Sequence, residues 1–270
     1  MGLRLREIRK DAGLTGRELA VATGWHFTRV SKLEHGVQAP SNEDIRLWCR
    51  ACSADEQIAD LIAQARTVES MYLEFRRQAR AGMKQMMLAP VPLEERTERF
   101  LIYEHHVIPG FFQTAGYTRA MLEFWFGFLE VHNDIDEAIA ARIDRQSILY
   151  DGNKTFAVVL EEAALYTRFG DANTLAGQLD RLLTVMSLPN VALGIVPRGA
   201  QRDAVGQVSF WVFDDELVSL ETPTASIEVT APQEVAMYRR MFDHLRQPAV
   251  YGKDARALVI KAQSELADSN

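Results

Sequence analysis

The stretch GRELAVATGWHFTRVSKLEHG, residues 16–36, decides the fold of the N-terminal part of the chain. Gly24 stands near its middle, where a tight turn needs a residue that tolerates positive φ. Thr15 and Glu18 form a T-x-x-E capping box ahead of the first helix. The apolar residues lie at spacings that face one small shared core: Leu19, Trp25, Val30 and Leu33. The pattern predicts two short helices held at a fixed angle, which is a helix-turn-helix.

The second predicted helix, about residues 26–35, has the position of the helix that lies in a DNA major groove. A glycine between two amphipathic helices is a weak signal by itself, because any helical hairpin can supply one. Here the apolar, small and glycine residues all occupy the positions that a helix-turn-helix requires. Gly36 and Pro40 then lead into another capped helix near Ser41. A helical hairpin that binds no nucleic acid is the alternative, and the agreement favours DNA binding.

Charge is unevenly divided along the chain. Residues 1–50 hold nine Lys and Arg against six Asp and Glu, a net charge of +3. Because the whole chain carries −7, residues 51–270 carry −10. This asymmetry suits a basic DNA-facing head on an acidic body that phosphate would repel. An acidic surface without a role is an equally simple explanation for the body.

Length and composition narrow the class of protein. A chain of 270 residues favours two domains, and 47% hydrophobic residues allow a sizeable core. We find no run of eighteen apolar residues, and the first ten residues, MGLRLREIRK, lack the apolar segment of a signal peptide. Cys49 and Cys52 form a C-x-x-C without a second pair, which favours reduced structural thiols over a zinc site. We therefore expect a cytoplasmic protein with no membrane span, metal or cofactor.

The predicted elements divide the chain into a head (1–54), a connecting segment (55–92) and a body (93–270). Further head helices are expected at about residues 2–11 and 41–52. Residues 55–82 carry an apolar stripe that predicts one long helix, either a linker or a dimer helix. A methionine-rich segment then breaks that helix, and such a cluster is typical of gap-filling packing.

In the body, strands and helices follow one another in a mixed order. Strands are expected at 100–107, 155–160, 191–196, 208–213, 217–221 and 226–229. Helices are expected at 114–128, 134–150, 161–169, 173–188, 232–246 and 253–267. The sequence therefore predicts an all-α head followed by an α+β body, in which helices cover a mixed sheet.

Motifs of catalysis are weak. Glu161 and Glu162 follow a strand, where acids often act, but neighbours on a helix point about 100° apart and more simply satisfy a helix N-terminus. His105 and His106 would face opposite sides of a strand and could not share one metal. Since G-x-S-x-G, G-x-x-x-x-G-K and G-x-G-x-x-G do not occur, we predict no catalytic residues and no enzyme.

The head resembles the XRE family, the helix-turn-helix of Cro and phage repressors. The body is similar to a domain found behind XRE heads in many actinobacterial regulators. Four segments carry that similarity: IYEHHVIPGFFQTAGYTRAML (102–122), ARIDRQSILY (141–150), FAVVLEEAALYTRFGD (156–171) and LPNVALGIVP (188–197). Such regulators are commonly paired with a small partner protein, in arrangements compared to toxin–antitoxin pairs or developmental switches. The resemblance thus implies a regulator, and a small protein encoded nearby as its candidate partner.

The same resemblance implies roles for individual head residues. Base-edge contacts would come from Phe27, Thr28 and Lys32, and Arg29 would reach base or phosphate. Phosphates would be held by Thr15, Arg17 and His35. A salt link between Arg9 and Glu34 would join the first and third helices.

Two head residues depart from the family pattern. Gly16 stands where many members have the glutamine that clamps a phosphate. His26 stands at the N-cap of the reading helix, where Ser or Thr is preferred. For Phe27, a hydrophobic contact within the head is the alternative to a base contact.

In the body, Arg142, Arg145 and Gln146 crowd one helix face. An aromatic segment precedes them: Phe124, Trp125, Phe126 and Phe128. Arg and aromatic residues are enriched where proteins bind one another, so we predict a partner-binding surface, with plain solvated charges as the alternative.

We therefore predict a sequence-specific transcription regulator whose body dimerises and receives a signal. One head has few base contacts, which favours a homodimer on a palindromic double-stranded operator. The alternatives are an antitoxin-like protein that sequesters a partner and regulates its own gene, and an enzyme with a DNA-binding head.

Overall fold

The computed structural model describes residues 1–62, 81–129, 131, 133–223 and 225–268. The chain forms two compact units, Met1–Leu73 and Glu74–Asn270. We call the described part of the first unit the head and that of the second the body. Most of the long helix expected at 55–82 lies outside the described residues. At its start the structure has a 3₁₀ turn, η1 (Asp55–Gln57).

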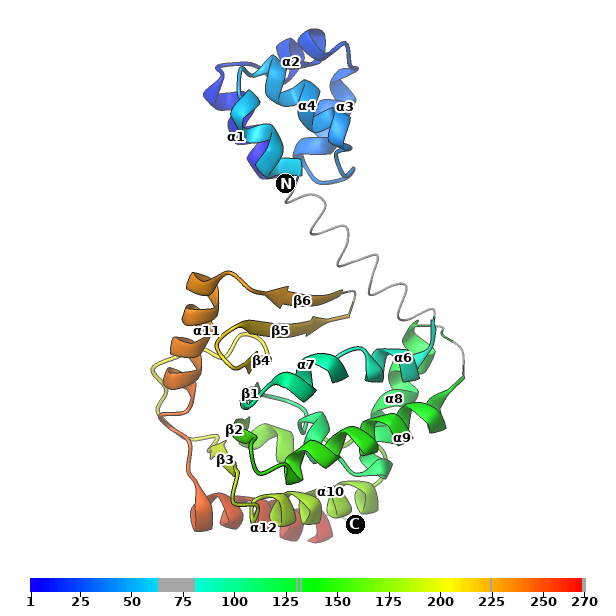
Figure 1. Cartoon of the computed structure of the whole chain (residues 1–270), viewed down its shortest axis with the longest axis vertical. Coiled ribbons are helices and arrows are strands. Elements are labelled where there is room, and N and C mark those ends of the chain that lie inside the picture. The colour runs from blue at the N-terminus through cyan, green and yellow to red at the C-terminus, as the bar shows by residue number, and fades with distance from the viewer. Residues whose placement is uncertain (63–80, 130, 132, 224, 269–270) are drawn as a thin grey trace. The chain divides into compact units, whose positions relative to one another are not determined.

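The head contains the α-helices α1 (Gly2–Asp11), α2 (Gly16–Thr23), α3 (Phe27–Glu34) and α4 (Asn42–Ala51) (Figure 1), and residues 58–62 are also helical. Its helix ends are set by local sequence. Thr15 and Glu18 form the expected capping box at α2, and Ser41 and Asp44 form another at α4. Gly24 ends α2 with φ = 72°, a conformation that favours glycine.

One apolar core holds these helices together. Each helix has an apolar stripe at helical spacing that faces the core, and this pattern predicted the helix-turn-helix. The fully enclosed members include Leu5, Leu19, Leu33, Ile45 and Trp48. The Trp48 indole also donates to the Leu5 carbonyl oxygen at 3.0 Å, which fixes α4 against α1.

The body contains a six-stranded mixed sheet in the order β3-β2-β1-β4-β5-β6. The parallel strands are β1 (Arg99–Glu104), β2 (Thr155–Glu161) and β3 (Val191–Val196). The antiparallel strands are β4 (Phe210–Phe213), β5 (Leu217–Thr222) and β6 (Ala225–Val229). This arrangement confirms the predicted fold class, a helical head followed by an α+β body.

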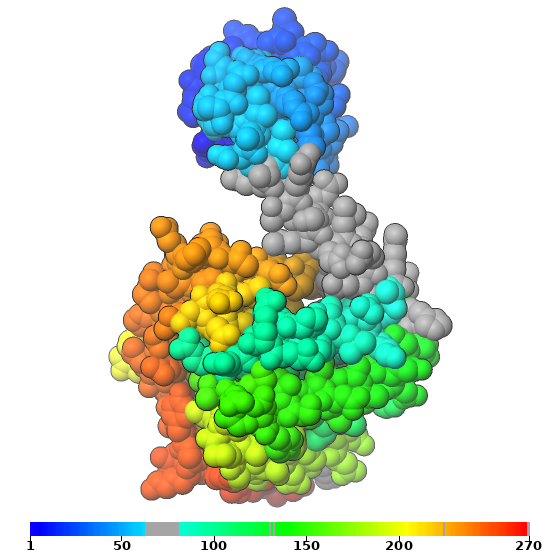
Figure 2. Space-filling model, viewed as in Figure 1, coloured from blue at the N-terminus to red at the C-terminus, as the bar shows by residue number. Residues whose placement is uncertain are grey.

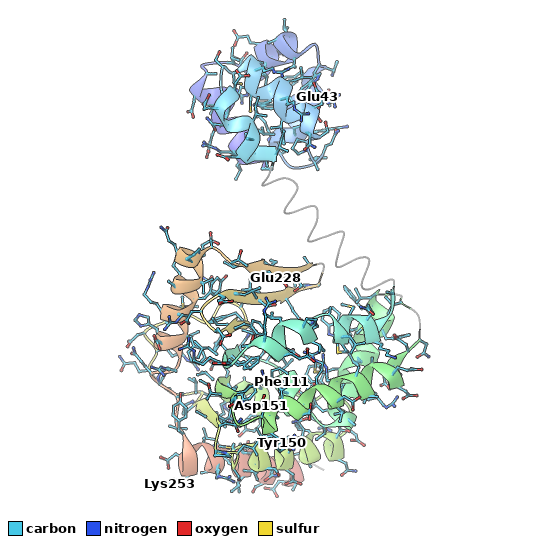
Figure 3. All side chains as sticks on the ribbon, viewed as in Figure 1. Glu43, Phe111, Tyr150, Asp151, Glu228 and Lys253 are labelled. Carbon is cyan, nitrogen blue, oxygen red and sulfur yellow. The ribbon has the colours of Figure 1, made fainter. Side chains whose placement is uncertain are left out.

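Successive strand residues point to opposite faces of the sheet, and both faces are buried at β2. In β2, Phe156, Val158 and Leu160 join the core beneath α10 (Ala172–Val185) and α12 (Gly252–Asp268). Val159 points the other way, into the core beneath α11 (Pro232–Leu245). Phe111, from the 3₁₀ turn η2 (Gly110–Phe112), lies inside the body (Figure 3).

A group of helices extends beyond the sheet: α6 (Met83–Leu88), α7 (Val91–Arg96), α8 (Ala115–Leu129) and α9 (Ile135–Arg145). Met83 and Met87 are buried between α6 and α9, which confirms the packing role expected for the methionine cluster. In the space-filling view, α6 and α7 lie beside α9 on the visible face (Figure 2). None of the described helices is long and apolar enough to cross a membrane.

Two predicted helices of the body are shorter than expected. The helix expected at 134–150 is α-helical only to Arg145 and ends in the 3₁₀ turn η3 (Gln146–Tyr150). The helix expected at 161–169 is only the short η4 (Glu162–Leu165), because Glu161 continues β2.

Candidate nucleic-acid interface

The start of α3 is fixed by the unusual N-cap residue His26. Its Nδ1 accepts from the Thr28 amide at 3.3 Å and lies 2.7 Å from the Thr28 hydroxyl. The imidazole nitrogen thus satisfies a backbone N–H that Ser or Thr would otherwise bind. The departure from the family pattern therefore leaves the N-terminus of α3 capped.

The second departure, Gly16, makes room for Phe27. A Cβ atom at Gly16 would lie 3.0 Å from Phe27 Cε2, so the ring rests against the α2 backbone. Phe27 nevertheless stays 48% exposed. One side of the ring packs within the head and the other side faces outward. The intramolecular contact and an external contact are thus compatible.

The remaining residues predicted to contact DNA lie on the surface of the head. Thr28, Lys32 and Arg17 are exposed, and within the described chain no acidic side chain pairs with Lys32 or Arg17. Thr15 Oγ1 accepts from the Glu18 amide at 3.2 Å, so this hydroxyl is used in capping α2. His35 Nδ1 donates to the Ser31 carbonyl oxygen at 2.8 Å and leaves the rest of the ring exposed.

Arg29 is held by the head itself. Its Nη2 donates to Asp44 Oδ1 at 2.7 Å, and its guanidinium carbon lies 4.9 Å from the centroid of the Trp25 ring. The same carboxylate accepts from the Ser41 amide at 3.0 Å. Arg29 therefore links α3 to the N-terminus of α4, and this geometry favours a role in positioning α3 over the predicted contact with base or phosphate.

The structure brings Arg9 and Glu34 together. Arg9 Nε lies 2.5 Å from Glu34 Oε1, and Nη2 lies 3.1 Å from Oε2. The two side chains are only 11% and 7% exposed. Hydrogen bonding to Glu34 raises the pKa of the Arg9 guanidinium, and Nη1 also donates to the Leu14 carbonyl oxygen at 2.6 Å. The pair ties α1 to the end of α3 and so fixes the angle between these two helices.

Cys49 and Cys52 are free thiols buried in the head core. Burial raises the pKa of Cys49, and it raises that of Cys52 to about 11. Since the thiolate is the reactive form, both side chains stay protonated and unreactive near neutral pH. Among the residues that the structure describes, no group of three or more His, Cys, Asp or Glu could hold a metal ion.

The three side chains predicted to form a partner-binding surface on α9 are instead paired within the body. Arg142 Nη1 donates to Gln113 Oε1 at 2.7 Å, and burial lowers the pKa of Arg142 to about 10. Arg145 binds both carboxylate oxygens of Glu94. Gln146 is buried and donates to the Gln113 carbonyl oxygen at 2.7 Å. All three side chains make intramolecular contacts, because residues distant in the sequence cover this face of α9.

A polar cluster follows the parallel strands β1 and β2. Glu161 forms a two-point ion pair with Arg202, both contacts being 2.6 Å, and accepts from the Tyr103 hydroxyl at 3.0 Å. Glu162 accepts from the Arg198 amide at 2.7 Å. Both acids lie at the N-terminus of η4, as expected, but neither carboxylate makes a capping hydrogen bond there. They hold the segment that follows β3, and sequence reasoning missed their arginine partners.

The histidine pair also differs from its prediction. β1 ends at Glu104, so His105 and His106 leave the strand, and their ring centroids lie 4.2 Å apart. His105 Nδ1 lies 2.7 Å from Ser209 Oγ. The neighbouring Glu104 is buried and accepts from Trp211 Nε1 at 2.8 Å, and burial raises the pKa of Glu104 to about 7. These contacts join β1 to the start of β4.

Comparison with known proteins agrees with this division of the chain. Residues 1–61 match a family model described as a helix-turn-helix domain. Residues 89–261 match the model described as a domain of unknown function, DUF5753. No curated protein matches the sequence. The helix-turn-helix supports a DNA-binding regulator, and because the second match covers more than half of the 270 residues, the chain belongs to the DUF5753 family.

Proposed function

We propose that this protein is a sequence-specific transcription regulator of the XRE type that reads DNA with the exposed side of α3. One observation carries the proposal. Val30 and Leu33 of α3 are buried in the head core, and Arg29 and Glu34 form ion pairs within the head. Phe27, Thr28 and Lys32 stay exposed. A helix that reads a major groove must pack one side against its own domain and expose the other side to the bases.

The chemistry of the exposed side chains fits base edges. Lys32 offers donors to guanine O6 and N7, and Thr28 offers a hydroxyl and a methyl group. The outward side of the Phe27 ring suits a thymine methyl group. Arg17, Thr15 and His35 then contact phosphates, where contacts position the protein without reading sequence.

We further propose that two chains bind one palindromic operator and that the body receives the signal that controls them. A single α3 of eight residues reaches too few base pairs for tight specific binding. The helix-turn-helix family solves this with two-fold symmetric half-sites. The opposite net charges of residues 1–50 and 51–270, +3 and −10, support a division of labour in which only the head faces DNA.

Selection of bound sequences from a random double-stranded library tests the proposal directly. The full-length protein should enrich one motif with two related halves. The triple variant Phe27→Ala, Thr28→Ala, Lys32→Ala should enrich none, while Lys253→Ala, which removes an exposed positive charge from the body, should enrich the original motif. Enrichment of the same motif by the triple variant would overturn the assignment of α3, and no enrichment by the wild type would overturn sequence-specific reading.

A further inference from the structure

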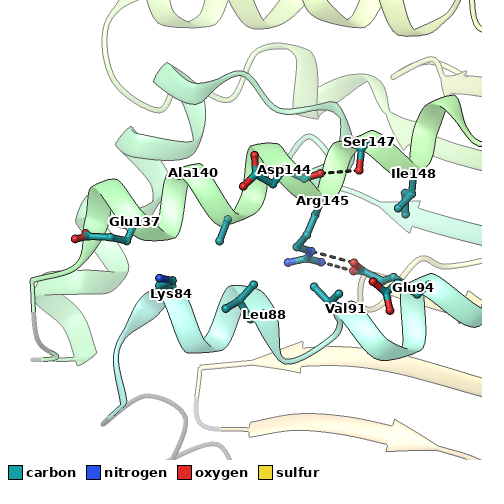
Figure 4. Close-up of a pocket in the computed structure, with 12 residues that line it drawn as sticks. Lys84, Leu88, Val91, Glu94, Glu137, Ala140, Asp144, Arg145, Ser147 and Ile148 are labelled. Atoms are coloured by element: carbon teal, nitrogen blue, oxygen red, sulfur yellow. Dashed lines mark hydrogen bonds and ion pairs between the residues drawn. The ribbon is translucent and has the colours of Figure 1, made fainter.

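The body contains a groove of about 400 Å³ between α6 and α7 on one side and α9 with the start of η3 on the other (Figure 4). Two clamps set its width. At one end the Asp134 carboxylate accepts from the Met83 and Lys84 amides, both at 3.0 Å. At the other end Arg145 binds Glu94 and donates to the Met87 carbonyl oxygen at 2.7 Å. The groove is therefore preformed.

The lining of the groove is largely apolar. Ala140 and Ala141 present only methyl groups from α9, so the facing helices leave a hollow. The aliphatic side chains that complete it are Leu88, Val91 and Ile148. An apolar groove of this volume is typical of sites for small organic molecules.

The polar groups of the groove are predominantly acidic. The Arg145 charge is neutralised by Glu94, which leaves the Lys84 ammonium against the carboxylates of Glu95, Glu137 and Asp144. These formal charges sum to −2. Within the described part of the chain, no side chain pairs with any of the three carboxylates, so they are available to a ligand.

We propose that this groove binds a small organic cation, an amine or guanidine carried on an apolar body. The apolar lining takes the body of the ligand, and the unpaired carboxylates take its positive charge through charge-assisted hydrogen bonds. An anion of the same shape is repelled by the net charge of −2. Binding of the cation in the groove does not depend on whether the protein binds DNA. An effect of the ligand on operator binding would rest on the proposed function as well.

Calorimetric titration of the full-length protein with three matched probes tests the site: 4-phenylbutylamine, 4-phenylbutanoate and 4-phenylbutan-1-ol. The amine should bind saturably, and at least tenfold more tightly than the other two. Ala140→Phe fills the groove and should weaken amine binding at least tenfold. Ala257→Phe places the same side chain on an exposed position of α12 and should leave binding unchanged.

The double variant Glu137→Gln, Asp144→Asn keeps the shape of the groove and removes two of its charges. It should bring the amine to within about threefold of the alcohol. Equal binding of amine and butanoate by the wild type, or unchanged binding by Ala140→Phe with a native circular dichroism spectrum, would overturn the site. This assay contains no DNA, so its failure overturns the cation site alone, whereas failure to bind any operator overturns the proposed function alone.

Discussion

At the scale of single residues, the buried pair of Arg9 and Glu34 matters because it joins two helices of one small core. Glu34→Gln should lower the free energy of unfolding of the head by about 3–5 kcal/mol, because Arg9 would remain as an uncompensated buried charge. Hydrogen exchange of α1–α4 amides in the full-length protein measures this loss. Arg46→Ala breaks an exposed pair with Glu43, whose side chains are 40% and 63% exposed, and should cost under about 1 kcal/mol. Equal effects of the two variants would contradict the buried role.

Glu104 should make the stability of the body depend on pH. Its folded pKa of about 7 lies above the value of about 4.3 in an unfolded chain, so the folded state binds the proton more tightly. The stabilising contribution is complete below about pH 4 and is lost as pH rises through 7. The total is up to about 4 kcal/mol.

Glu104→Gln cannot ionise and keeps an oxygen that accepts from Trp211 Nε1. The difference in unfolding free energy between this variant and the wild type should therefore grow in the variant's favour between pH 5 and pH 8. Urea denaturation at a series of pH values measures that difference. A constant difference across the range would show that Glu104 ionises with an ordinary pKa.

At the scale of elements, substitutions in α2 and α3 should distinguish residues that contact bases from residues that contact phosphates. Lys32→Ala and Thr28→Ala should each flatten discrimination at particular operator positions, and loss of a good bidentate base contact should cost about 1–3 kcal/mol. Arg17→Ala should weaken operator and random DNA alike, because phosphate contacts carry no sequence information. Affinities of each variant for operator and random duplexes at one salt concentration measure both effects. An unchanged ratio for Lys32→Ala would remove Lys32 from the reading surface.

The elements also show which parts of the molecule a sequence can predict. The helices of the head follow from contacts three or four residues apart, such as the Thr15 and Glu18 capping box. The contacts of the charged residues on α9 do not follow from local sequence. Arg145 pairs with Glu94, which is 51 residues away, and Arg142 donates to Gln113, which is 29 residues away. The hydrophobic period predicts which side of a helix is apolar. It contains no information about which distant segment covers the polar side.

The same limit applies to the two candidate sites. The exposed residues of α3 could be predicted because the helix-turn-helix is a local motif with a fixed way of facing DNA. The groove could not be predicted, because its walls are α6 with α7 and α9, which are separated in the sequence by the whole of β1 and α8.

At the scale of the whole molecule, the prediction concerns how many chains act together. Two heads related by a two-fold axis should read half-sites whose centres lie about one helical turn, or a multiple of it, apart. Light scattering should then give the mass of two chains bound to one operator. A monomer both free and on DNA would contradict the homodimer.

Spacing variants of the operator test the same symmetry from the side of the DNA. Inserting five base pairs between the half-sites turns one half about 180° away from the other, because a turn holds about 10–10.5 base pairs. Binding should then fall to the level of a single half-site. Inserting ten base pairs restores the relative rotation and should recover part of the affinity, limited by how far the two heads can separate. If five and ten inserted base pairs weaken binding equally, each head binds DNA independently, and the two halves of the operator are not read by one symmetric dimer.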